Sequence, residues 1–316
     1  KPIEYSGSYG TNGFYLPFKQ DYTVEGFSTV TWAGTGVQQY IGGVGFQPDF
    51  LLSKRRSGED NGMAFDSVRG VTKRLLSNSA DAEATSTTIL KSFDTDGFTV
   101  GTDGYMNYAA GNHYVAWCWD MGGSNATNTN GNITSTVRAN TSYGQSIVSW
   151  VGNRTANATI GHGLSSTPEL VIIKNRSDAG NWRVHDNISG KTNGRMDLDA
   201  SGAENTSNHQ ITFQSTTFNL GSEAGQHEDW NENNENIIAY CFHSVTGYSK
   251  IGSYTGNSSS TGPTVTFGFK MAFVVIKRTD TANAWYLLDT TRDASGKITS
   301  TLAADTNGAE GSQSPW

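Results

Sequence analysis

The sequence predicts an all-β protein of tandem antiparallel β-sandwich-like repeats, with two full units and a partial third. Only 16% of its 316 residues are charged, and glycine, serine, threonine and asparagine are abundant, which favours short strands and tight turns over helices. No long run shows apolar residues at the helical period. Instead, one apolar phrase recurs three times along the chain.

The recurring phrase is a short apolar run that ends at a lysine. Lys54, Lys174 and Lys277 close the three copies, and a strand-like run followed by glycine precedes each copy. Successive lysines are separated by roughly 100 to 120 residues, which is longer than one turn of a solenoid. We therefore interpret each copy as part of a small β-unit duplicated in tandem, and we assign features present in every copy to the scaffold.

The expected organisation has five segments. An N-terminal strand segment covers residues 1–26, the first repeat unit covers 27–123, and the second unit covers 146–247. Between the two full units lies a connector, residues 124–145, which is rich in Gly, Ser, Asn and Thr and has little to bury. The partial third unit covers 248–316.

Each full unit contains six strand-like runs bounded by turn-forming residues. In the first unit the runs are 29–33, 49–54, 63–68, 89–93, 98–101 and 114–119. In the second unit they are 146–151, 170–174, 182–185, 211–213, 218–221 and 237–243.

The third unit is shorter than the others. An Ala-Glu pair that ends at Glu83, Glu204 or Glu310 occurs in every unit, but only the first two units continue into a Gly-Phe hairpin and a cysteine-containing strand. An incomplete unit would expose strand edges and apolar faces. Residues 9–16 resemble the hairpin sequence 93–100, so the N-terminal segment could complete the third unit; alternatively, natural flanking sequence is missing.

The two cysteines fall at the same place in successive units. Cys118 and Cys241 each lie in an apolar strand, which predicts two buried thiols and not a disulfide.

The net charge of −7 argues against a nucleic-acid partner, because phosphate binding needs clustered cations. The cations are scattered apart from the run 54–56, which we interpret as a solvated strand end. No apolar stretch reaches the length of about 20 residues needed for membrane insertion.

Candidate binding residues lie in the two loops that precede the cysteine strands. Tyr105 and Tyr108 in the first unit, and His227 and Trp230 in the second, stand among carboxylates and amides. Aromatic faces beside polar groups suit the recognition of sugar rings, so these four residues are weak candidates for receptor or glycan binding. An ordinary solvated loop explains them equally well.

Other polar residues have a structural explanation. The sequence 94–97 resembles the start of a calcium loop but lacks its later ligands, so we predict a hairpin turn. His185 aligns with Phe65, which predicts a packed histidine. No catalytic signature, metal cluster or cofactor motif is present, and we predict no enzyme, although two carboxylates from distant strands could still meet.

Several phrases of the chain carry a family resemblance. They are the segments 45–50, 65–70, 92–98, 114–119, 248–257 and 272–280. Together they resemble a repeat domain found in structural proteins of tailed bacteriophages, especially the tail-fibre and virion proteins of marine and cyanobacterial phages. The resemblance covers almost the whole chain.

The resemblance implies a non-enzymatic virion structural protein, and most of all a tail-fibre or host-recognition component located in the virion. It implies a homo-oligomer, by default a trimer, that contacts other virion proteins and a host surface glycan or protein. The alternatives are a purely architectural capsid or tail protein, a glycan-binding lectin-like module and, last, a polysaccharide depolymerase. The resemblance supplies no catalytic residues.

Overall fold

The computed structural model describes residues 26–188, 194–206, 211–221, 230–259, 261–293 and 298–311. Within these ranges the regular structure consists of antiparallel strands and one four-residue helix, α1 (Gly104–Asn107). The predicted all-β sandwich-type class is therefore confirmed. The N-terminal hairpin expected at 9–16 lies outside the described residues.

The first large sheet is formed by the N-terminal half of the chain. Its strand order is β1 (Phe27–Ala33), β9 (His113–Trp119), β3 (Phe50–Arg55), β4 (Met63–Asp66), β5 (Lys73–Leu76) and β6 (Ala84–Thr85). A small sheet covers one of its faces, in the order β2 (Gln39–Gly42), β8 (Gly97–Val100) and β7 (Leu90–Asp94). The β7–β8 connection is the hairpin turn expected at 94–97.

The second large sheet has the same arrangement around its central strand. Its order is β10 (Ala126–Asn128), β11 (Ser135–Asn140), β12 (Gln145–Val151), β19 (Asn236–Phe242), β14 (Leu170–Asn175), β15 (Arg183–Asp186) and β16 (Met196–Asp197). Its small covering sheet has the order β13 (Thr159–Gly161), β18 (Thr217–Asn219) and β17 (Thr212–Phe213).

Cross-strand positions recur in the two large sheets. Cys118 in β9 is paired with Leu51, and Cys241 in β19 is paired with Val171. Both cysteines are free and fully buried, as the sequence predicts, and burial raises the pKa of the Cys241 thiol to about 12.

The third sheet is smaller and contains only β20 (Phe273–Ile276), β21 (Tyr286–Asp289) and β22 (Leu302–Ala303) in that order. Leu288 is paired with Val274, as Phe65 is paired with Leu51 in the first sheet. The third sheet therefore corresponds to β3, β4 and β5 without the central strand.

The connector expected at 124–145 is not a loose linker. It contains β10 and β11, and β11 pairs along its length with β12 of the second sheet. Val137 is buried in the outer core of that sheet. The abundant small polar residues concealed this short alternating strand, whose few apolar side chains all face one side.

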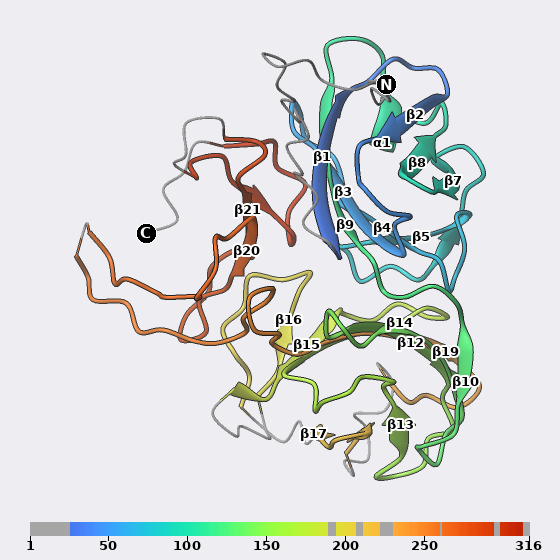
Figure 1. The fold of residues 1–316 in the computed structure, drawn as a ribbon. Helices are drawn as coiled ribbons and strands as arrows, with labels where there is room; N and C mark the ends of the chain where they lie inside the picture. Colours follow the sequence, from blue (N-terminus) through green and yellow to red (C-terminus); the bar gives the residue numbers. More distant parts are fainter. Residues whose placement is uncertain are drawn as a thin grey trace, which may run out of the picture.

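The three sheets pack around one shared core. One face of every sheet contributes to it, including Trp117 from the first, Tyr240 from the second and Leu287 from the third. In Figure 1 the first sheet lies at the upper right, the second below it and the third at the left. Each large sheet also has a separate outer core under its small sheet.

Lysines close this arrangement into a ring. Each of the three recurring lysines donates from Nζ to a backbone carbonyl of another unit: Lys54 to Thr306, Lys174 to Ala80, and Lys277 to Ser201. The first unit thus contacts the third, the third contacts the second, and the second contacts the first. Burial lowers the pKa of Lys54 to about 8, so its ammonium group remains mostly charged at neutral pH.

Backbone hydrogen bonds follow the same ring. The turn whose carbonyl accepts from the lysine also donates a backbone amide to the residue two positions after that lysine. The three bonds run from Glu310 N to Arg56 O, from Glu83 N to Arg176 O, and from Glu204 N to Thr279 O. The three Ala-Glu pairs noted in the sequence are therefore the turns on which neighbouring units join.

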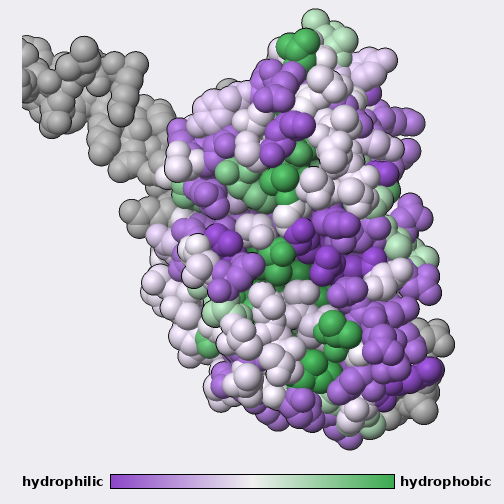
Figure 2. All heavy atoms as spheres, turned by 90° about the vertical axis from the view of Figure 1, so that its right-hand side faces the viewer, coloured by the Kyte–Doolittle hydropathy of each residue, from purple (hydrophilic) through white to green (hydrophobic). Residues whose placement is uncertain are grey.

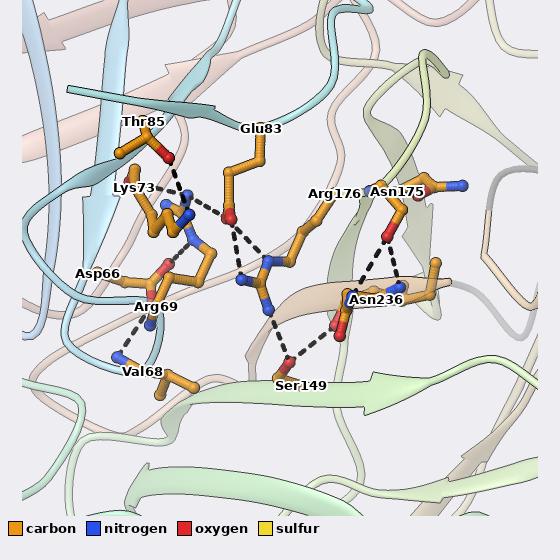
Figure 3. Close-up of polar contacts among 12 residues, drawn as sticks. Asp66, Val68, Arg69, Lys73, Glu83, Thr85, Ser149, Asn175, Arg176 and Asn236 are labelled. Carbon is orange, nitrogen blue, oxygen red and sulfur yellow. Dashed lines mark hydrogen bonds and ion pairs between the residues drawn. The ribbon is translucent and has the colours of Figure 1, made fainter. Parts of the chain in front are cut away.

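Glu83 of the first unit binds two arginines, Arg69 of its own unit and Arg176 of the second unit (Figure 3). Arg176 binds its carboxylate in a bidentate manner, with N–O distances of 2.8 and 3.0 Å, and Arg69 Nη1 lies 3.2 Å from Oε2. Arg69 also pairs with the fully buried Asp66 at 2.5 Å. This network is one in which every charge has an opposite partner, as burial requires.

A matching network joins the first and third units. Arg56 binds Glu310 at 2.6 and 2.9 Å, Arg292 lies 3.3 Å from the same carboxylate, and Arg292 pairs with buried Asp289 at 2.5 Å. At the contact between the second and third units, the residue at the position of Arg56 is Thr279, which cannot form a bidentate ion pair with a carboxylate.

Two tryptophans add hydrogen bonds between neighbouring units. Trp182 Nε1 donates to Leu76 O at 2.7 Å, and Trp285 Nε1 donates to Asp197 O at 2.8 Å. The first unit has Gly62 at this position, where a Cβ would lie only 2.1 Å from a neighbouring hydroxyl. The three units therefore contact one another in equivalent ways, although the side chains at equivalent positions are not all the same.

The interpretation of residues 54–56 as a solvated strand end is wrong for two of the three residues. Lys54 is fully buried, and the Arg56 side chain is only 25% exposed against Glu310. Their partners lie in the third unit, more than 200 residues later in the chain. A local pattern could not reveal them.

The Glu83 network should contribute strongly to stability. We expect Glu83→Gln to lower the free energy of unfolding by about 3 kcal/mol, because Arg69 and Arg176 would lose their shared carboxylate. Asp81→Asn is the matched control, since Asp81 is exposed and should change stability by less than about 0.5 kcal/mol. Urea unfolding measures both variants, and equal midpoints would contradict the assignment.

The same carboxylates should make stability depend on pH. Burial is the largest single influence on Glu83 and Glu310 and opposes their ionisation. The hydrogen bonds and charges of Arg176 and Arg69 around Glu83, and of Arg56 and Arg292 around Glu310, together outweigh it and lower each pKa below the usual 4.5. The unfolded chain therefore takes up protons first as pH falls, and stability present above pH 4.5 is lost as pH falls through the lower native pKa values. A Glu83→Gln/Glu310→Gln variant should lose part of this dependence in unfolding curves between about pH 5 and pH 2.

Candidate functional site

A hollow beside α1 brings together two of the four candidate residues. It has a volume of about 220 Å³ and is lined by Arg55, Asp60, Asp103, Gly104, Tyr105 and Tyr108. Tyr108 is 56% exposed and Tyr105 is half-buried. We name these six residues the α1 hollow.

A buried asparagine holds the α1 loop in place. Asn107 is fully buried, and its Nδ2 donates to Val37 O at 2.5 Å and to Gly101 O at 2.7 Å. Its Oδ1 accepts from Thr35 N at 2.8 Å and from the Gln39 side chain at 2.8 Å. A fully satisfied amide of this kind fixes the loop against the β1–β2 connection and the start of β2.

Tyr114 fixes the ends of the short helix. Its hydroxyl accepts from Tyr108 N and donates to Gly104 O, both at 2.8 Å. Asp103 is the N-cap and accepts from Tyr105 N at 3.0 Å. The two tyrosine side chains of the hollow are therefore presented from a backbone that is already ordered.

Two arginines lie over the tyrosine rings. The Arg55 guanidinium carbon is 5.6 Å from the centre of the Tyr108 ring, and that of Arg74 is 5.2 Å from the centre of Tyr105. These are cation–π distances. Gly104 makes room for the Tyr108 ring, because a Cβ there would lie 2.7 Å from Tyr108 Cδ2.

The charges of the hollow are mixed. Burial raises the pKa of Asp60, and nearby Arg55 acts in the opposite direction. Asp60 and Asp103 can accept hydrogen bonds, Arg55 can donate them, and the tyrosines offer both an apolar face and a hydroxyl. This combination suits a neutral polyhydroxylated ligand that stacks on a ring and is bound at its rim.

Trp230 does not take part in such a surface. It is 2% exposed, belongs to the outer core of the second sheet, and donates from Nε1 to Leu220 O at 3.0 Å. Its neighbour Asn231 anchors the loop as Asn107 does, accepting from Asn153 N, so Trp230 occupies the place of buried Met106. The prediction of Trp230 as a binding residue is wrong, and His227 lies outside the described residues.

The sequence missed four residues of the α1 hollow, namely Arg55, Asp60, Asp103 and Gly104. Asp103 carries a usable signal, because Asp is one of the residues preferred at a helix N-cap. Arg55 and Asp60 are separated from the loop by about half a unit, and only the β3–β9 pairing brings them near Tyr108.

Other candidate chemistry is confined to structural roles. His185 is 1% exposed and packs edge-on against the Trp230 ring, which confirms the prediction of a packed histidine. Among the described residues, no group of three or more His, Cys, Asp or Glu side chains could hold a metal ion. In the same part of the chain, no helix is long and apolar enough to cross a membrane.

Figure 2 shows the face of the molecule that lies on the right-hand side of Figure 1. Hydrophilic and intermediate side chains dominate it, and the hydrophobic ones form small separated groups. A large contiguous apolar patch, which would indicate a stable protein interface, is not visible on this face.

The fold and the α1 hollow define an all-β protein of packed antiparallel sheets with an exposed aromatic and charged loop site. Residues 23–315 match the model of a family described as "Domain of unknown function (DUF7483)", and the chain belongs to this family. No curated protein and no solved structure matches the chain.

Trp230 and Tyr108, both candidates from the sequence, should respond differently to truncation. We expect Trp230→Ala to lower the free energy of unfolding by about 3 to 5 kcal/mol, because it leaves a cavity and an unpaired Leu220 carbonyl. Tyr108→Ala should cost less than about 1 kcal/mol, since the ring is largely exposed. Thermal and urea unfolding test both, and a stable Trp230→Ala variant would contradict the buried placement.

Proposed function

We propose that this protein is a non-enzymatic structural component of a bacteriophage virion that contributes to host recognition, as in a tail fibre. Its assembly would be a homo-oligomer, with a trimer as the default, in contact with other virion proteins. The family resemblance suggests the setting. The α1 hollow supports the recognition role, because it is the site where exposed aromatics and charges converge on an ordered loop.

A rigid scaffold suits this role. The lysine and glutamate contacts link every unit to both others, so loops can vary in sequence without loss of the shared core. A recognition loop on such a scaffold binds with little loss of conformational entropy.

The ligand class that we propose for the α1 hollow is a cell-surface glycan. Tyr108 offers a ring for stacking, while Asp60, Asp103 and Arg55 provide acceptors and donors for sugar hydroxyls. The open, shallow form of the hollow suits one or two sugar rings of a larger polymer.

A purely architectural role is the second candidate. The contacts that join each sheet to both others favour it, because a rigid scaffold of this kind can serve assembly by itself. An architectural protein would leave the α1 hollow without a ligand.

A binding assay on surface polysaccharides and a glycan array tests the recognition role. We expect the purified chain to bind at least one surface glycan, and Tyr108→Ala to weaken that binding about tenfold or more. Tyr254→Ala is the matched control, since Tyr254 is 48% exposed and lies in the third unit, away from the hollow.

Four results would count against the proposal. Equal loss of binding in the Tyr108 and Tyr254 variants would show that the α1 hollow is not the glycan-binding site. Binding to no glycan would favour the architectural role. Glycan shortening during the assay would point to an enzyme, and failure to detect the chain in purified particles by mass spectrometry would contradict the virion setting.

A further inference from the structure

Two histidines lie under the small covering sheet of the second unit and have no counterpart in the first. His162 follows β13 and is fully buried, and His243 follows β19 and is 8% exposed. Val44 and Asp120 take these positions in the first unit, where their backbone amides donate to the equivalent carbonyls. The two imidazoles are therefore a feature of one unit and not of the repeated scaffold.

The hydrogen bonds of His162 hold its ring in the neutral form. Leu164 N donates to Nδ1 at 3.1 Å, so this nitrogen carries no proton, and Nε2 donates to Gln214 O at 3.2 Å. The ring thus joins the turn before β14 to the β17–β18 hairpin of the covering sheet. A second proton on Nδ1 would face the N–H of Leu164 and abolish this bond.

His243 also lacks an acceptor for a second proton. Its Nδ1 donates to Ser244 O at 2.9 Å, which leaves Nε2 as the unprotonated nitrogen. Nε2 is buried and has no hydrogen-bond partner within the part of the chain that the structure describes. The ring is closely surrounded, since a Cβ on Gly144 would lie 2.8 Å from its Cε1. Protonation would leave a buried N–H without an acceptor, which is unfavourable.

The groups packed against His162 supply no negative charge. Ser146 of β12 donates to the His162 carbonyl at 2.8 Å, and Val137 of β11 lies beside the adjacent Gly163. The ionisable neighbour whose charge acts on His162 is His243. Burial lowers the pKa of His162 below the usual 6.5, and His243 acts in the same direction, against the hydrogen bond to Gln214 O.

Two further titratable groups lie near the pair. Glu169 is held by Ser244, whose backbone N donates to the carboxylate at 2.8 Å. His185 of β15 belongs to the same side of the sheet and packs edge-on against Trp230 of the outer core. His185 is therefore the histidine whose effect has to be separated from that of the pair.

We propose that protonation of His162 and His243 in mild acid opens the covering sheet of the second unit while that of the first unit stays closed. The closed form disfavours a proton on His162, whereas the open form accepts it at the ordinary pKa near 6.5. Opening is therefore favoured as the pH falls below about 6.5 and is suppressed above it. The open form exposes the outer core of the second unit, including Phe218 and Cys241.

The two buried cysteines report the opening of each covering sheet in the full chain. Cys241 lies in the outer core of the second unit and Cys118 in that of the first, and both are free. Dithiodipyridine reacts with thiols in mild acid because its leaving group is a good one, and mass spectrometry follows labelling at each cysteine. We expect the ratio of the Cys241 rate to the Cys118 rate to rise at least about tenfold between about pH 7.5 and pH 5.

His162→Val is the matched variant, because it introduces the residue of the first unit. It should keep the second covering sheet closed in acid and lose most of the rise in the ratio. If His162→Val unfolds, His162→Asn replaces it, since asparagine keeps an acceptor for Leu164 N without a ring that titrates. His185→Phe is the control, again with the first-unit residue, and should retain the rise.

The proposal is overturned if the ratio in the unchanged chain stays constant across this pH range. Equal acceleration at Cys118 and Cys241 would mean that the whole chain unfolds in acid, which also overturns it. A rise that survives the His162 substitution but disappears in His185→Phe would assign the response to His185 and not to the pair. None of these results bears on glycan binding at the α1 hollow, which lies in the first unit.

Discussion

The ring of contacts among the three sheets is the constraint on which the rest of the structure depends. Each sheet has one apolar face that must be buried, and three sheets achieve this by facing one shared core. An apolar core alone leaves sheets free to slide past one another, whereas Lys54, Lys174 and Lys277 each fix a strand end to a specific carbonyl of another unit. Lys174 and Lys277 donate to two or more carbonyls, and Lys54 lies in the field of Asp305 and Asp60, which offsets part of the cost of burying these charges.

The three contacts of the ring are not equal. A bidentate arginine–glutamate pair joins the first unit to the second at Glu83 and to the third at Glu310, but Thr279 stands at the equivalent position of the second–third contact. The third sheet is therefore joined to the first by a bidentate ion pair, and to the second by the Trp285 hydrogen bond to Asp197 O. Among the described residues this sheet also lacks a central strand, so the greatest departures from threefold regularity lie together.

The repeats made most of the fold predictable from the sequence. A phrase that recurs with its lysine and its cysteine gives the strands and the burial of Cys118, because the same physical demands recur in each unit. The sequence failed where a residue is defined by distant partners. From the sequence, Arg56 is expected to be a solvated cation, but in the fold it pairs with Glu310. Trp230 is expected to be exposed, but the hydrogen bond to Asn231 holds its loop so that Trp230 turns inward. Of the α1 hollow, only the tyrosines and the N-cap residue Asp103 carry a local signal in the sequence.

The candidate binding site and the scaffold meet on one strand end. Side chains of successive residues in a strand point to opposite sides, so Lys54 and Arg56 reach the third unit while Arg55 lies over Tyr108. Asp60 belongs to both features: its backbone amide donates to Asn307 O of the third unit at 2.7 Å, and Asp60 also lines the α1 hollow. Asp60 of the hollow is thus fixed by the contact between units, whereas Asp103, Tyr105 and Tyr108 are carried by the α1 loop. Substitutions in that loop can therefore change what the hollow binds without weakening the ring, whereas substitutions of Lys54 or Arg56 remove contacts of the ring.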